Sequence, residues 1–303
     1  MSSTAVPARA PGRPLAGYLL VAALTLFWGL NWPSMKVALQ EVPVWPFRAL
    51  CCGFAGIGML LVARIGGHRL IPGRGELLPL AICSAGNVTA WHLFTAYGLL
   101  EIGAGRASII AFTMPLWLAL LTILVLREPP SGRQLLALVL GLAGLAALTL
   151  PDLARLRAAP LGVLYILGAA IAWAIGTIVL KRTRWSMPTV SLTAWQLLAG
   201  GAPIILGTLL FHPPFDWTSL SPRGLAAVAF TLLLPMLICQ WVWFKIVEIF
   251  PPSVAGLSTL AIPVVGVLSG ALLLGEPVGL AEMAALALVL PALALVLLAP
   301  AGH

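Results

Sequence analysis

Long apolar runs dominate the chain, and short polar connections separate them. A helix that crosses the hydrocarbon core of a bilayer needs about 20 predominantly apolar residues, and ten runs approach or reach that length. We expect membrane-spanning helices at about 17–38, 44–64, 77–98, 105–126, 133–150, 161–180, 189–211, 224–245, 253–274 and 281–299. The connections are too short to hold a separate soluble domain.

The fourth and ninth runs resemble each other. Residues 107–129 and 255–277 each carry a proline near the middle, Pro115 and Pro263, and end in a Glu-Pro pair, all at an offset of 148. A proline inside a helix removes a backbone hydrogen bond, and a membrane bundle accommodates the resulting kink. We predict that the two prolines mark paired bends that help to gate a transport path. The Glu-Pro pairs are expected to start the spans that follow.

Further matches extend this repeat over the chain. Trp28 recurs as Trp173, 145 residues later, and at the same offset Asn31 is matched by Gly176, so the halves differ chemically. Because each half holds five spans, an odd number, the second half must run upside down. The predicted fold is an all-α membrane protein of ten transmembrane helices, arranged as two inverted five-helix repeats.

The expected domains follow from this repeat and from the charged ends of the chain. A disordered basic tail is predicted at 1–14, the first repeat at 15–150 and the second at 151–303. With the N-terminus inside, eleven Lys and Arg residues fall on the cytoplasmic side and six, Arg48 among them, on the outer side. Cytoplasmic loops carry the excess of basic residues. We therefore predict a multi-pass protein of the bacterial inner membrane with both termini in the cytoplasm.

The composition excludes a soluble globular protein. Hydrophobic residues make up 61% of the chain and charged residues 9%, whereas a soluble domain carries about 25% charged residues. The net charge of +8 lies in loops, where basic residues set topology, so no nucleic-acid partner is expected. The four cysteines lie in apolar runs without metal-ligand spacing, and no metal or cofactor is expected.

Charged groups are absent from the middle of the predicted spans. All nine acids fall at or near span ends, whereas ion-coupled transporters commonly place an acid inside the membrane. No basic residue is expected deep in the bundle either. His92 is the one titratable group expected near mid-membrane, and desolvation keeps such a group neutral unless it is a proton carrier. We predict transport that is not obligatorily driven by sodium and at most weakly by protons.

The polar side chains within the spans are neutral, and many share a helical face. Indole rings and amides suit a small neutral or zwitterionic solute with apolar parts. Each residue also has a structural alternative, such as an anchoring Trp or a Thr that bonds its own helix; for Thr89 and Thr113 we expect that alternative. The predicted substrate-binding residues are Trp28, Asn31, Asn87, Trp91, His92, Trp117, Trp173, Thr177 and Gln240.

These features resemble the drug/metabolite transporter superfamily, and within it the EamA type. The resemblance rests on Phe-Trp-Gly-Leu-Asn at 27–31 and on the repeated stretches 107–128 and 255–276, and it covers about 15–299. Within the family the chain is most similar to the bacterial YddG-type exporters of aromatic and other amino acids. That similarity implies export through a central cavity between the two halves by alternating access.

We therefore expect an exporter of amino acids or related metabolites. The alternatives are a permease for a nucleoside or a sugar derivative, a membrane scaffold and an intramembrane enzyme. An enzyme is disfavoured because the sequence has no HExxH motif, P-loop or paired carboxylates at mid-membrane. Spans five and ten are almost purely apolar and are expected to face lipid or a second copy of the chain.

Overall fold

The protein is an all-helical bundle over the residues that the structure describes. This structure is a computed structural model, and it describes residues 15–126, 131–149, 160–249, 259 and 261–297. Within these ranges no β-strand occurs. The predicted tail at 1–14 lies outside them, as does most of the first half of the ninth predicted span.

The helices follow the apolar runs of the sequence. Those of residues 15–126 are α1 (Leu15–Glu41), α2 (Val44–Ile65), η1 (Arg74–Glu76), α3 (Leu77–Ser84), η2 (Ala85–Ala90), α4 (Trp91–Glu101), α5 (Ala104–Ala111) and α6 (Met114–Leu126). The later ones are α7 (Gly132–Thr149), α9 (Pro160–Arg182), α10 (Thr189–Phe211), η4 (Trp217–Ser219), α11 (Pro222–Thr231), η5 (Leu232–Ile238), α12 (Cys239–Ile249), α14 (Ile262–Leu274) and α15 (Leu280–Leu297).

Many of these helices are long enough to cross a membrane. Among the described residues, seven helical segments have the length and apolar composition of a span, and α7, α14 and α15 contain shorter apolar stretches. The prediction of an all-α membrane protein is confirmed at this level. The count of ten spans and their inverted arrangement stay predictions.

The third and eighth predicted spans are interrupted by π-helical turns that the sequence did not lead us to expect. η2 separates α3 from α4, and η5 separates α11 from α12. Pro235 lies in η5 and lacks the N–H that a regular helix requires. In η2, a side chain at Gly86 would overlap the carbonyl of Ala172 in α9, so close helix contact requires glycine there.

The fourth predicted span is broken, and this corrects the expectation of a kink at a proline inside a helix. α5 ends at Ala111 and α6 begins at Met114, so Pro115 is the second residue of a new helix. Pro263 has the same place in α14. A proline in the first turn leaves no hydrogen bond unmade, because that N–H has no partner within the helix.

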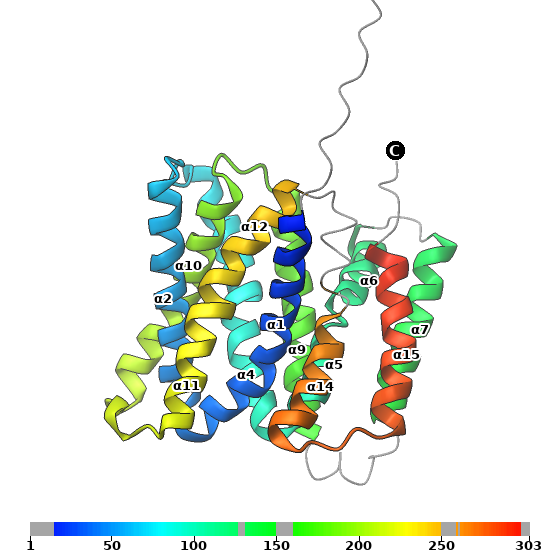
Figure 1. Cartoon of the computed structure of the whole chain (residues 1–303). Helices are drawn as coiled ribbons and strands as arrows, with labels where there is room; N and C mark the ends of the chain where they lie inside the picture. Colours follow the sequence, from blue (N-terminus) through cyan, green and yellow to red (C-terminus); the bar gives the residue numbers. More distant parts are fainter. Residues whose placement is uncertain (1–14, 127–130, 150–159, 250–258, 260, 298–303) are drawn as a thin grey trace, which may run out of the picture.

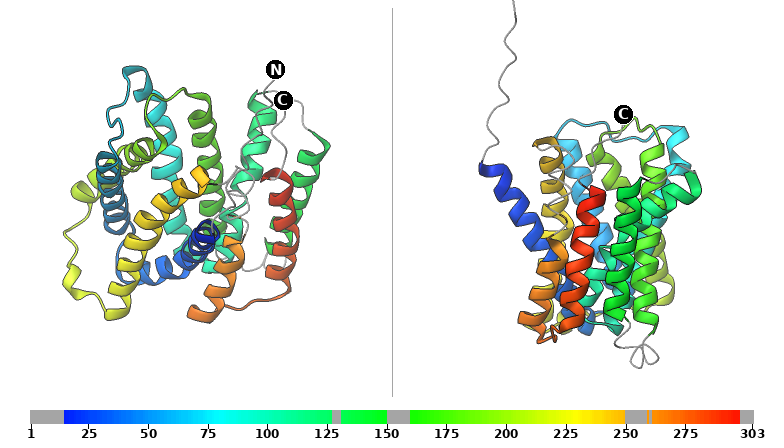
Figure 2. Two further views of the ribbon diagram at one scale, coloured as in Figure 1. Left: turned by 45° about the horizontal axis from the view of Figure 1, so that its top comes forward. Right: turned by 90° about the vertical axis from the view of Figure 1, so that its right-hand side faces the viewer.

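The bundle is built from closely packed helix pairs, as Figure 1 shows. α2 lies along α10, and α7 lies along α15 at one side of the bundle (Figure 2). α9 packs against α3, η2, α4 and α6, whereas α1 packs against α11, α12 and α14. α1 begins and α15 ends at the same end of the bundle (Figure 1).

Candidate functional site

Arg48 is the largest fully buried side chain of the described residues, with 2% of its surface exposed. It lies in the second turn of α2. Its Nη2 donates a hydrogen bond to Thr95 Oγ1 of α4 at 3.0 Å, while its Nε has no partner. This corrects two expectations, that Arg48 belongs to the outer polar segments and that no basic residue lies deep in the bundle. The available sequence signal was that no other charged residue lies within residues 44–63.

Trp91 and His92, two predicted binding residues, lie on α4 one turn before Thr95. The Thr95 hydroxyl donates to the Trp91 carbonyl at 2.7 Å, so the partner of Arg48 is itself fixed to the helix. His92 is buried, and its Nδ1 lies 2.9 Å from the carbonyl oxygen of Val88. The structure thus places an indole, an imidazole and a guanidinium around one turn of α4.

Asn87 lies in the π-helical turn η2 and faces α9 and α10. Its Nδ2 donates to Gln196 Oε1 of α10 at 3.2 Å, and its buried Oδ1 has no hydrogen-bond partner. A side chain at Gly176 of α9 would collide with that Oδ1, so glycine at this position makes room for the amide. Thr89 donates to the Gly200 carbonyl of α10, and our expectation that it bonds its own helix was wrong.

Trp28 joins α1 to the second π-helical turn. Its Nε1 donates to the Pro235 carbonyl at 3.3 Å, and its ring lies 5.9 Å from that of Trp243. Gln240, at the start of α12, is half-buried. Asn31, one turn beyond Trp28, has a buried Oδ1 without a partner. Three predicted residues thus lie on α1 and on α12, which pack against each other.

The remaining predicted residues lie elsewhere. Trp117 donates from Nε1 to Thr113 Oγ1, and the two line a small apolar hollow between α6 and α7. Thr113 donates to Ile110 of its own helical segment, as expected. Trp173 is half-buried on α9, and Thr177 donates its hydroxyl to the Trp173 carbonyl, which is the structural alternative for a threonine.

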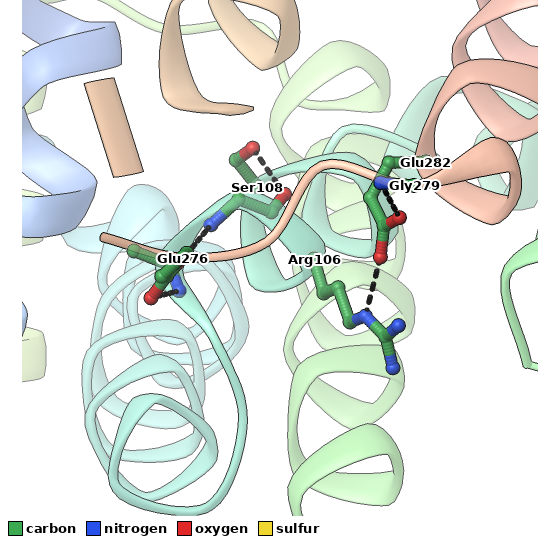
Figure 3. Close-up of polar contacts among 7 residues, drawn as sticks. Arg106, Ser108, Glu276, Gly279 and Glu282 are labelled. Carbon is green, nitrogen blue, oxygen red and sulfur yellow. Dashed lines mark hydrogen bonds and ion pairs between the residues drawn. The ribbon is translucent and has the colours of Figure 1, made fainter. Parts of the chain in front are cut away.

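Glu276 follows α14, which ends at the same end of the bundle as α1 (Figure 1), and Figure 3 shows its contacts. Its carboxylate accepts hydrogen bonds from Ala104 N at 2.7 Å and Gly105 N at 2.9 Å, the first amides of α5. An anion is favourable there because a helix N-terminus carries partial positive charge. Lys36 Nζ lies 3.5 Å from Glu276 Oε1 and donates to the Ile102 carbonyl at 2.8 Å.

A second ion pair lies beside the first. Arg106 Nε lies 2.7 Å from Glu282 Oε1, and Gly279 N donates to Glu282 Oε2 at 2.8 Å (Figure 3). Glu282 therefore caps α15, which begins only at Leu280. The expectation that Glu276 starts the tenth span was wrong, because its carboxylate is used by α5.

A bundle of apolar helices with polar side chains buried between them is typical of a multi-pass membrane protein. The chain belongs to the EamA-like transporter family, whose sequence pattern matches residues 15–150 and 160–298. The match confirms the family predicted from the residues at 27–31 and from the repeated stretches.

Several similar proteins are named as transporters. The uncharacterized transporter YvbV of Bacillus subtilis is 27% identical over 92% of this chain and 90% of its own length. The uncharacterized inner membrane transporter YedA of Escherichia coli K12 is 26% identical over 94% and 91%. Protein PecM of Dickeya dadantii is 25% identical over 75% of each chain. One solved crystal structure matches with a TM-score of 0.63 and 21% identity over 92% of this chain and 96% of that chain, a likeness of fold alone.

Proposed function

We propose that this protein is an inner-membrane transporter that exports amino acids or closely related metabolites by alternating access. The observation that carries the proposal is a set of buried polar atoms without protein partners: Asn31 Oδ1, Asn87 Oδ1 and Arg48 Nε. Unsatisfied polar groups are costly inside a membrane protein and commonly mark a substrate path. The resemblance to amino-acid exporters and the nearby indole rings favour this substrate class.

Two inverted five-helix repeats are the proposed architecture. If the first five spans are exchanged with the second five, the contact between α4 and α9 corresponds to the contact between α12 and α1. The α2–α10 and α7–α15 pairs each correspond to themselves. The π-helical turns begin at Ala85 and Leu232, 147 residues apart, which is also the separation of Glu101 and Glu248. These correspondences support a duplicated chain of ten spans.

Both termini are proposed to lie in the cytoplasm. The support is the excess of basic residues on that side, eleven against five once the buried Arg48 is left out, and the position of the start of α1 and the end of α15 at one end of the bundle (Figure 1). The end of the bundle at which Glu276 lies then faces the outside. A reporter fused after His303 that is active only in the periplasm should be inactive, and its activity would overturn this orientation.

Counterflow in proteoliposomes tests the function. The purified protein is loaded with unlabelled solute, and uptake of labelled amino acids, nucleosides and sugars is compared with empty liposomes. Trp28→Ala should lower amino-acid exchange because it removes the hydrogen bond to Pro235 and the ring beside Trp243. Trp217→Ala, in the short helix η4 and with 39% of the residue exposed, is the matched control and should leave exchange unchanged. Exchange of nucleosides alone would contradict the proposal.

A permease for a sugar derivative is the second candidate. Phosphorylated sugars require basic residues along the path, and the buried Arg48 is one such residue. Sugar phosphates therefore belong in the same counterflow panel. Exchange of a sugar phosphate without any amino acid would replace the first candidate by the second.

A further inference from the structure

We propose that Arg48 binds the carboxylate of the transported solute, an inference that rests on the proposed function and narrows its substrate to carboxylate-bearing molecules. The solute is an α-amino acid with an apolar side chain. Its carboxylate approaches the guanidinium from α4, where Trp91 and His92 lie.

The charge of Arg48 is not balanced within the described protein. A guanidinium stays protonated in proteins, and burying an unpaired charge is strongly unfavourable. Two ion pairs occur among the described residues, and their acids, Glu276 and Glu282, are paired with Lys36 and Arg106. Arg48 donates to the neutral hydroxyl of Thr95 and lies beside the buried thiols of Cys51 and Cys52, and it has no carboxylate within ion-pair distance among those residues.

Packing alone does not account for this arginine. The contact with Thr95 ties α2 to α4, but any neutral donor of similar length would make the same bond. The hydrogen bond between α2 and α4 requires neither the unpaired Nε–H nor the positive charge of Arg48. They match a carboxylate, which accepts two parallel hydrogen bonds from a guanidinium.

The surroundings of Arg48 indicate what else the solute carries. Thr95 and Trp91 are four residues apart on α4, so they lie on one face, about one turn or ~6 Å along the helix. That distance suits a solute whose carboxylate and apolar side chain leave the same carbon atom. The half-buried indole of Trp91 offers an apolar surface for the side chain.

A carboxylate fits this site better than a phosphate monoester. One guanidinium balances one negative charge, whereas a phosphate monoester carries about −1.5 to −2 at neutral pH. His92, the nearest further titratable group on α4, is buried, and its Nδ1 is engaged with the Val88 carbonyl. No second basic side chain among the described residues is as deeply buried as Arg48.

The experiment compares amino acids with their amides. L-tryptophan, L-phenylalanine and L-leucine are tested in counterflow beside tryptophanamide, phenylalaninamide and leucinamide, which keep the ammonium group and the side chain but lose the carboxylate charge. Wild type should exchange the acids at least about tenfold better than the amides. Arg48→Gln should abolish that preference by lowering exchange of the acids. Arg64→Gln, an exposed arginine on the same helix, should keep it.

A binding readout keeps the test valid where a variant folds poorly. The rise in melting temperature of the detergent-purified protein with each probe is measured for wild type, Arg48→Gln and Arg48→Lys. Wild type should be stabilised by the acids and not by the amides. Arg48→Lys keeps the charge without the paired donors and should retain a reduced shift. Without solute, Arg48→Met should melt no lower than wild type, because it removes an unpaired buried charge.

The outcomes separate this inference from the proposed function. Exchange of amino acids with an unchanged preference for acid over amide in Arg48→Gln would overturn the inference and leave the transporter intact. Exchange of nucleosides or unmodified sugars alone would overturn both. Exchange of sugar phosphates that depends on Arg48 would show that Arg48 binds a phosphate, and would overturn the proposed binding of a carboxylate. A lower melting temperature in Arg48→Met, with the preference kept in Arg48→Gln, would assign Arg48 a structural role and overturn the inference.

Discussion

Glu276 and Ala104 are 172 residues apart, yet the carboxylate of one accepts a 2.7 Å hydrogen bond from the backbone amide of the other. The same carboxylate accepts from Gly105 and lies beside Lys36. A loop that follows α14 thereby supplies the cap of α5. The hydrogen bonds of Glu276 thus join the two segments at this end of the bundle.

Removal of this cap should destabilise the protein. Glu276→Ala removes the acceptor of two helix-start amides and the ion-pair partner of the partly buried Lys36, and we expect a loss of about 2–4 kcal/mol in the free energy of unfolding. Thermal melting of the purified protein measures it. Glu101→Ala, an exposed acid at the end of α4, is the control and should shift stability by less than about 0.5 kcal/mol. Equal melting temperatures of the two variants would show that Glu276 does not stabilise α5 as a cap.

Gly176→Ala should disturb the amide of Asn87. The added methyl group would overlap Asn87 Oδ1 and press on the Cys83 carbonyl, so we expect a loss of about 1–3 kcal/mol. Gly132→Ala has open space around it and should be neutral or slightly stabilising. Adding Asn87→Ala to Gly176→Ala should recover part of the loss. Strictly additive effects in this double-mutant cycle would show that the two side chains do not meet.

Pro115→Ala and Pro263→Ala test the predicted role of these residues in gating. Each proline is the second residue of its helix, so alanine should change stability by no more than about 1 kcal/mol. Alanine restores an N–H and favours a continuous helix across the break, which should slow exchange by roughly threefold or more if the break must flex. Pro203→Ala, at an exposed position of α10, is the control. Wild-type exchange rates in both variants would remove the gating role.

Transport should not require a sodium or pH gradient. The described acids lie in loops or near helix ends: Glu41, Glu76, Glu101, Asp216, Glu248, Glu276 and Glu282. A coupling ion usually needs a carboxylate or free carbonyls at mid-membrane. Downhill exchange should therefore persist when both gradients are collapsed. Concentrative uptake that needs a pH gradient and vanishes in His92→Ala would instead make His92 a proton carrier.

The sequence predicted the family and the positions of the helices, because both depend on local features. Apolar runs of the right length specify the helices, and the stretch at 27–31 identified the family. The depth of a side chain in the bundle, and the contacts between residues far apart in the sequence, could not be predicted from such local features. Arg48 lies near the start of an apolar run, where a long basic side chain can equally extend to the membrane surface, so its burial depends on α4.

The other differences have similar physical reasons. The role of Glu276 could not be predicted, because a carboxylate can cap any helix that folding brings to it. Pro115 is compatible with a kink or with a helix start, and only the preceding turn distinguishes the two. Thr89 can bond its own helix or another, and the close approach of α10 at Gly200 decides between them.

The paired π-helical turns also bear on the history of the chain. A π-helical turn holds about one residue more than an α-helical turn, so each is equivalent to a single-residue insertion in a regular helix. η2 and η5 begin 147 residues apart, at the same position of the proposed repeat. On the proposed repeat, one insertion in an ancestral five-helix protein, inherited by both copies when its gene was duplicated, would account for the two turns. Separate insertions would have had to occur in the same turn twice.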